Sequence, residues 1–238
     1  MDDPIQYPVP WDLVFGLTPH IMHGTQRSVD DFSAAVVARM KPEPKIRGLE
    51  LLPEDPRFLL VANHYQRKGL WILHSASVAT QAIRKRYGAG DPPVRWVVTA
   101  NWPAVRLGPW KFTNPGDRLL PRVADALNCY AVSFAKNNPG FTARSIRRLL
   151  REAPRLTRPI GLFPEGVAGT AGKLTGPLPG VDRLILHLAR SGVPAVPMAI
   201  SESGGLIVQF GKTVAARELA AAPNSAQLMM ERIAGLLA

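Results

Sequence analysis

The order of apolar and polar residues along the chain predicts an α/β domain. Short apolar runs bounded by turn residues predict strands, and apolar positions recurring every three or four residues predict helices. The predicted strands are residues 58–62, 94–99, 129–134, 160–163, 195–200 and 206–210, with a shorter one within 45–53. The predicted helices are residues 29–40, 66–87, 119–127, 141–152, 181–190 and 224–237. Strands alternating with helices indicate a single domain with a mixed, largely parallel sheet flanked by helices.

Several boundaries have local signals. Ser28 stands three residues before Asp31, as in an N-terminal capping box, and Asn224 is placed to cap the last helix. Residues 1–27 are interrupted by prolines and are expected to form an arm ahead of a domain at 28–238. Residues 100–117 contain three prolines and two tryptophans and are expected to form no regular element.

Two of the predicted strands run directly into polar residues. The first leads into Asn63 and His64, and the strand at 160–163 leads into Pro164, Glu165 and Gly166. In an α/β sheet the carboxyl ends of parallel strands share one rim, where ligands usually bind. We therefore expect His64 and Glu165 to face one pocket.

Three sequence blocks carry a family resemblance. The NH motif at residues 63–64, the FPEG motif at 163–166 and the apolar VPAVPMAI at 193–200 span most of the chain in this order. Together they resemble the glycerolipid acyltransferase family, whose lysophosphatidic acid acyltransferases carry NH-x4-D and FPEGTRS. The resemblance implies an α/β enzyme of phospholipid biosynthesis. Such an enzyme would transfer a fatty acyl group from acyl-CoA or acyl carrier protein to a hydroxyl of a lipid-like acceptor, without a metal or further cofactor.

The sequence also departs from the family pattern. Gly69 stands where the family has its aspartate, and residues 167–169 replace Thr-Arg-Ser. The family's arginine block has only a loose counterpart, in which Lys136 is the one cation. Because these phosphate-binding residues are altered, we do not expect lysophosphatidate itself to be the acceptor. For the missing carboxylate three outcomes are open: another acid such as Glu165 or Asp91, a main-chain carbonyl or water, or weak or absent catalysis.

His64 is the candidate general base, because a histidine with an ordinary pKa near 6.5 can accept the proton of an attacking alcohol. If Arg67 and Lys68 lie close, they keep the ring neutral by lowering its pKa. The resemblance gives Glu165 the role of positioning the acceptor. Its alternative role is that of a turn residue whose carboxylate accepts main-chain N–H groups.

The candidate substrate-binding residues surround these two positions. They are Asn63, Arg67, Lys68, Gly166, Lys173 and Lys136. The loop at 166–180 has five glycines, a composition suited to presenting N–H groups to a phosphate. Lys173 is the only cation in this loop, and its alternative role is that of an ordinary exposed lysine.

Charge narrows the choice of partners. The chain has 29 Lys and Arg against 18 Asp and Glu, a formal net charge of +11. Such a surface attracts anionic lipid headgroups, the phosphates of coenzyme A or an acidic carrier protein, although a plain solvated basic face explains the charge equally well. Nucleic acid is not expected, because basic and aromatic residues are not interleaved and no reader motif is present.

Membrane contact is expected to be peripheral, at the cytoplasmic face. The sequence has no run of about 20 apolar residues and no secretory signal. Residues 11–22 are amphiphilic and fit either a membrane interface or an arm packed on the domain's core. Cys129, the only cysteine, lies in an apolar segment and is expected to be a buried structural thiol. A family member that binds lipid without turnover is the alternative function.

Overall fold

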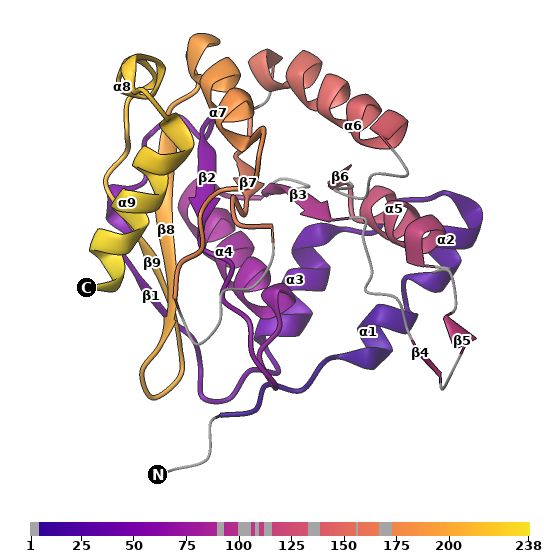
Figure 1. The fold of residues 1–238 in the computed structure, drawn as a ribbon. Helices are drawn as coiled ribbons and strands as arrows, with labels where there is room; N and C mark the ends of the chain where they lie inside the picture. Colours follow the sequence, from indigo (N-terminus) through magenta and orange to yellow (C-terminus); the bar gives the residue numbers. More distant parts are fainter. Residues whose placement is uncertain are drawn as a thin grey trace.

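A seven-stranded sheet forms the centre of the protein, as seen in a computed structural model (Figure 1). The structure describes residues 5–89, 93–99, 106–107, 110–111, 116–132, 139–155, 157–166 and 173–238. The strand order is β1-β9-β8-β2-β7-β3-β6, and every pair is parallel except β8 and β9. The strands are β1 (Lys45–Arg47), β2 (Leu59–Ala62), β3 (Arg95–Thr99), β6 (Tyr130–Val132), β7 (Ile160–Leu162), β8 (Ala195–Glu202) and β9 (Leu206–Phe210). This confirms the predicted α/β class and the mixed, largely parallel sheet.

Helices cover both faces of the sheet. The side chains of each strand alternate between the faces, and in β2 both sets are apolar and buried. Leu60 and Ala62 of β2 belong to an apolar cluster that includes residues of α4 (Ile72–Tyr87). Leu59 and Val61 belong to a second cluster. The face with α4 also carries α5 (Gly116–Ala126), and α3 (Val29–Val37) packs on α4. The opposite face carries α6 (Pro139–Glu152), α7 (Val181–Arg190) and α9 (Ser225–Leu237).

The helix caps predicted from the sequence are present. The Ser28 hydroxyl accepts a hydrogen bond from the Asp31 N–H at 3.2 Å, and the Asn224 side chain accepts one from the Gln227 N–H at 2.8 Å. Each cap satisfies one of the N–H groups that a helix start leaves without an intrahelical partner.

Other boundaries differ from the prediction. Helix α4 begins at Ile72 rather than residue 66, because Arg67 and Leu70 close a tight turn with two main-chain hydrogen bonds of 3.0 Å. Two antiparallel strands, β4 (Arg106–Leu107) and β5 (Trp110–Lys111), occur where no regular element was expected. Helix α8 (Ala216–Ala221) was not predicted, since six residues are too few for a clear periodicity. The predicted strand at 129–134 extends beyond the described residues.

From residue 5 onward, the N-terminal arm packs against the rest of the chain. Tyr7 is 1% exposed, and its hydroxyl accepts a hydrogen bond from the Leu206 N–H at 3.0 Å. Its own N–H donates to the Gly69 carbonyl at 2.7 Å. Nε2 of His74, on α4, lies 3.3 Å from the Pro8 carbonyl oxygen. The arm therefore fixes the turn that follows the first motif.

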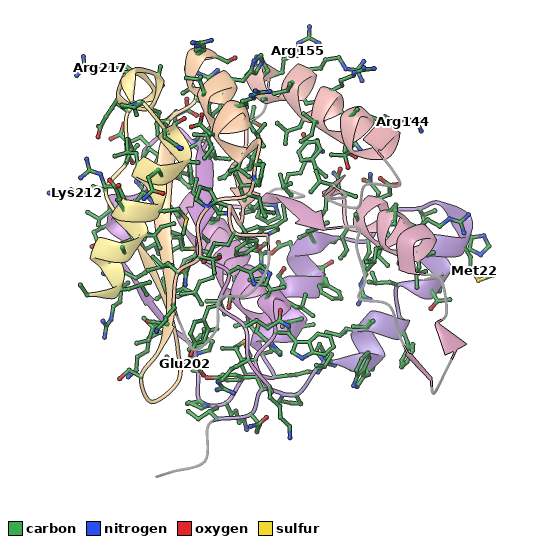
Figure 2. All side chains as sticks on the ribbon, in the orientation of Figure 1. Met22, Arg144, Arg155, Glu202, Lys212 and Arg217 are labelled. Atoms are coloured by element: carbon green, nitrogen blue, oxygen red, sulfur yellow. The ribbon has the colours of Figure 1, made fainter. Side chains whose placement is uncertain are left out.

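The arm continues into two short helices, α1 (Trp11–Phe15) and α2 (Thr18–His23), whose apolar residues divide between core and surface. Leu13 and Leu17 pack against α3, whereas three large side chains remain exposed: Trp11 at 51%, Phe15 at 67% and Met22 at 75%. Met22 projects from the edge of the molecule in Figure 2. In the described part of the chain, no helix combines the length and apolarity needed to span a bilayer.

Cys129 is buried, as predicted. It is 7% exposed, and burial raises the pKa of its thiol to about 12. A thiol with so high a pKa is uncharged at neutral pH, so Cys129 is a structural residue and not a nucleophile.

Candidate functional site

The two sequence motifs meet at the rim where β2 and β7 end. These strands are parallel neighbours, with Val61 paired to Leu162. His64 lies two residues beyond the end of β2, and Glu165 lies three residues beyond the end of β7. The short, fully buried strands bring both motifs to one edge of the sheet, which is the usual place for a site in this class of fold.

Glu165 holds the main chain of His64. Its carboxylate accepts a hydrogen bond from the His64 N–H at 2.5 Å through Oε2. The other oxygen, Oε1, accepts from the Thr175 N–H at 2.5 Å and from the Thr175 hydroxyl at 3.0 Å. Glu165 itself is 2% exposed, whereas its hydrogen bonds to His64 and Thr175 are part-buried. The carboxylate thus ties the strand ends to the loop around Thr175, and these contacts match its alternative role as an acceptor of main-chain N–H groups.

The ring of His64 is half-buried against an aromatic pair. Its edge meets Phe163 with ring centroids 5.6 Å apart at 68°, and Phe163 stacks on Trp96 at 5.1 Å and 9°. Burial lowers the pKa of His64 below 6.5, against smaller raising effects from its own main chain and from the charge of Glu165. The direction agrees with the sequence-based expectation, but the cause is burial and not the proximity of Arg67 and Lys68. A lowered pKa leaves the ring neutral at pH 7, as a general base must be.

One ring nitrogen of His64 lacks a partner. Nδ1 is buried and has no hydrogen-bond partner among the described residues. Position 69, where an aspartate was looked for, has no room for a side chain, because Gly69 has a φ of +77° and a Cβ built on it would lie 1.8 Å from Oε1 of Gln6. The arm therefore occupies the space into which a side chain at position 69 would point. Asp91, the other proposed acid, lies outside the described residues.

The remaining candidate residues have structural contacts of their own. Asn63, 3% exposed, donates from its amide to the Ile200 carbonyl at 3.0 Å and accepts from the Ile200 N–H at 2.7 Å, which joins β2 to β8. Arg67 forms an ion pair with Glu202 and donates to the Ile5 carbonyl at 2.7 Å. For Asn63 and Arg67, substrate binding stays a prediction, and it would have to coexist with these contacts.

The other predicted substrate contacts lie around the second motif and the turn. Gly166, with a φ of +65°, closes a turn in which its N–H donates to the Phe163 carbonyl at 3.2 Å. Lys68 and Lys173 are exposed. Lys136 lies outside the described residues. Within the described ranges, no group of three or more His, Cys, Asp and Glu side chains is placed to hold a metal ion.

Three contributors to the site were not predicted: Thr175, Gln6 and Trp96. Thr175 lies ten residues after Glu165 and Gln6 lies 63 residues before Gly69, so no local sequence pattern links them to the motifs. Trp96 belongs to a segment recognised only as a strand. The apolar run around it predicts a buried strand, but it does not show that the tryptophan stacks on a motif residue.

Comparisons with known proteins agree with the architecture. No protein-family model matches the sequence, and no curated protein matches it either. Among solved structures, the chain is similar to the 1-acyl-sn-glycerophosphate (LPA) acyltransferase PlsC from Thermotoga maritima, with a TM-score of 0.56 and 14% sequence identity. The match covers 93% of this chain and 90% of that one. At this identity the likeness concerns the fold, and we conclude that the chain has the fold of that acyltransferase over nearly its whole length.

Proposed function

We propose that this protein is an acyltransferase that moves a fatty acyl group from a thioester donor to a hydroxyl of a lipid-like acceptor. The observation that carries the proposal is a half-buried histidine, neutral at physiological pH, at the rim where two motif strands end. The fold of a known acyltransferase supports it. Because fold alone does not establish a reaction, the proposal depends on the chemistry of His64.

In the proposed reaction His64 acts as general base. Because Nδ1 is buried, Nε2 is the nitrogen that accepts the hydroxyl proton while the acceptor oxygen attacks the thioester carbonyl carbon. The tetrahedral intermediate collapses with cleavage of the carbon–sulfur bond, and the departing thiolate takes up the proton. Glu165 keeps the main chain of His64 in place, so that the ring does not move away from the attacking oxygen.

We also propose that the protein works at an anionic membrane surface, at the cytoplasmic face, with acyl-CoA or acyl carrier protein as donor. The net charge of +11 favours anionic lipid, and Trp11, Phe15 and Met22 are large exposed apolar side chains on α1 and α2. Flotation with phosphatidylglycerol vesicles tests this. A double variant Trp11→Ala/Phe15→Ala should float less than wild type, whereas Leu51→Ala, which also removes an exposed apolar side chain, should not.

An activity assay tests the catalytic proposal. Full-length protein is given hexadecanoyl-CoA or the matching acyl carrier thioester, with monoacylglycerol, lysophosphatidate and glycolipid acceptors. Loss of a general base typically costs about 10²–10⁴ in rate, so His64→Ala should fall by at least about 100-fold. His23→Ala, on exposed α2, is the matched control and should retain the wild-type rate. Equal rates for His64→Ala and wild type would remove the catalytic role.

A lipid-binding protein without turnover is the second candidate function. The unpartnered Nδ1 of His64 and the crowding at Gly69 favour it, because no described carboxylate orients the ring. Mass spectrometry of lipids that copurify with the protein, combined with the assay above, separates the two. Bound lipid without turnover on any donor and acceptor would select this function.

A further inference from the structure

An apolar groove runs between α6 and α7. These two helices lie over β6 and β7 in Figure 1. Its floor is formed by residues from three strands, Val97, Val132 and Leu162. Its walls are formed mainly by Ile146 and Leu150 of α6 and by Val181 and Leu184 of α7. The cavity volume is about 450 Å³. A volume of this size is typical of sites for small molecules, which are mostly apolar with a few polar groups.

The groove is separate from the His64 site. Its floor and walls belong to the apolar cluster on the α6 and α7 face of the sheet. The ring of His64 instead contacts Phe163, which packs with Trp96 against the cluster on the α4 face. Leu162 and Phe163 are consecutive residues and therefore lie on opposite faces of the sheet. A molecule bound in the groove therefore lies on the opposite face of the sheet from the His64 ring.

Basic side chains lie on both helices that flank the groove, and one arginine lines it. Arg183 and His187, one turn apart on α7, line it directly, and both are exposed. On α6, three exposed arginines follow one another at helical spacing: Arg144, Arg147 and Arg151. Figure 2 shows Arg144 at the outer surface of this helix.

The acidic residues of these two helices are already engaged. Glu152, the acid of α6, pairs with Arg95 at 2.5 Å and with Arg148 at 3.0 Å. Asp182, the acid of α7, accepts hydrogen bonds from the Ser225 hydroxyl at 3.0 Å and from the Ala226 N–H at 3.2 Å.

Arg183, which lines the groove, is therefore not neutralised by either of these two acids. No described carboxylate lies within ion-pair distance of Arg183, so an anion from outside the chain can bind there.

We propose that the groove binds a single-chain anionic amphiphile, such as a fatty acid, at a site distinct from that of the His64 reaction. The aliphatic chain lies along Val97, Val132 and Leu162, and the anionic head binds at Arg183 and His187. A guanidinium suits this role because it presents several donors to a carboxylate or phosphate. The groove is lined by twelve described residues, which favours this occupant over a protein partner, since a stable protein interface takes about 20–30 residues on each side.

Binding of hexadecanoate to the full-length protein, below its micelle concentration, tests the proposal. We expect one molecule per chain, and hexadecan-1-ol, with the same chain but no charge, should bind about tenfold more weakly or worse. Arg183→Ala should weaken hexadecanoate binding by about tenfold, which corresponds to the loss of one charge-assisted hydrogen bond. Arg183 is exposed, so this variant should fold. Arg217→Ala, an exposed arginine on α8, is the matched control and should bind as wild type.

Two further measurements locate the ligand. Leu184→Trp narrows the groove and should abolish binding, and a photoreactive hexadecanoate should label α6 or α7. His64→Ala should bind as wild type, so failure of the acyl transfer reaction and failure of this site are distinguishable. The proposal is overturned by absence of stoichiometric binding, by equal binding to wild type, Arg183→Ala and Leu184→Trp, or by labelling of α4 instead. It is equally overturned if sedimentation shows a dimer that Leu184→Trp dissociates, because a second copy would then fill the groove.

Discussion

Removal of the Glu165 carboxylate should destabilise the protein and disturb the His64 site together. In Glu165→Ala the His64 N–H loses its acceptor in a part-buried position, at a cost of about 1.5–3 kcal/mol for a bond to a charged group. The Thr175 N–H and hydroxyl also lose their acceptor, but Thr175 is exposed and water replaces it, at about 0.5–1.5 kcal/mol. The expected loss in the free energy of unfolding is therefore about 2–4.5 kcal/mol.

Urea unfolding followed by tryptophan fluorescence measures this loss, since Trp96 stacks on Phe163 beside the site. Glu218→Ala is the control, because its partner Arg232 is 53% exposed and exposed ion pairs contribute about 0–1 kcal/mol. Glu165→Gln keeps one acceptor oxygen and should lie between wild type and Glu165→Ala. A Glu165→Ala protein within about 1 kcal/mol of wild type would refute the reasoning, because the buried carboxylate would then contribute no more than a surface one.

Three further outcomes follow from the structure. Burial lowers the pKa of His64, so the acid limb of the pH–rate profile should have its midpoint below pH 6.5, and a midpoint at or above 6.5 contradicts this. The contribution of this histidine to stability is fully present above pH 6.5 and should be lost as the pH falls below 6.5 and through the lower pKa of the folded state. Gly69→Asp should cost about 1–2 kcal/mol of stability, because the residue has a positive φ and its Cβ meets Gln6. The double variant Gln6→Ala/Gly69→Asp relieves the clash and should recover part of that loss of stability. Its rate should also rise if the missing carboxylate limits the reaction. Equal stability of the single and double variants would show that Gln6 is not the obstacle. Cys129, with a pKa raised to about 12 by burial, should react with a thiol reagent at pH 8 only as fast as the protein opens, and reaction at the rate of a free cysteine would be inconsistent with its burial.

Much of the architecture was predictable because it depends on local patterns. The apolar runs of β2 and β7 are fully buried strands, and the Ser28 and Asn224 caps depend on residues only three positions apart. The start of α4 was predicted six residues too early, because Gln66, Arg67 and Lys68 are residue types compatible with a helix. These residues instead form a turn, which is held by two main-chain hydrogen bonds between Arg67 and Leu70 and by the hydrogen bond from the Tyr7 N–H to the Gly69 carbonyl.

The candidate site was predictable in its location but not in its contacts. The sequence placed His64 and Glu165 at strand ends, and in a parallel sheet such ends share a rim. It did not indicate that the carboxylate of Glu165 binds the main chain of His64 rather than its ring, since that depends on side-chain direction. It also gave no sign of Gln6 beside Gly69, which requires the arm to return across the turn.

The sequence by itself determined which segments become strands and helices, where the two motifs lie on them, and the excess of positive charge, because each of these depends on residues close together in the chain. Only the tertiary structure decided the strand order, the burial that lowers the pKa of His64, the contact between the arm and Gly69, and the groove between α6 and α7. Those features arise from packing between residues that are often more than 60 positions apart, and no local pattern encodes such contacts.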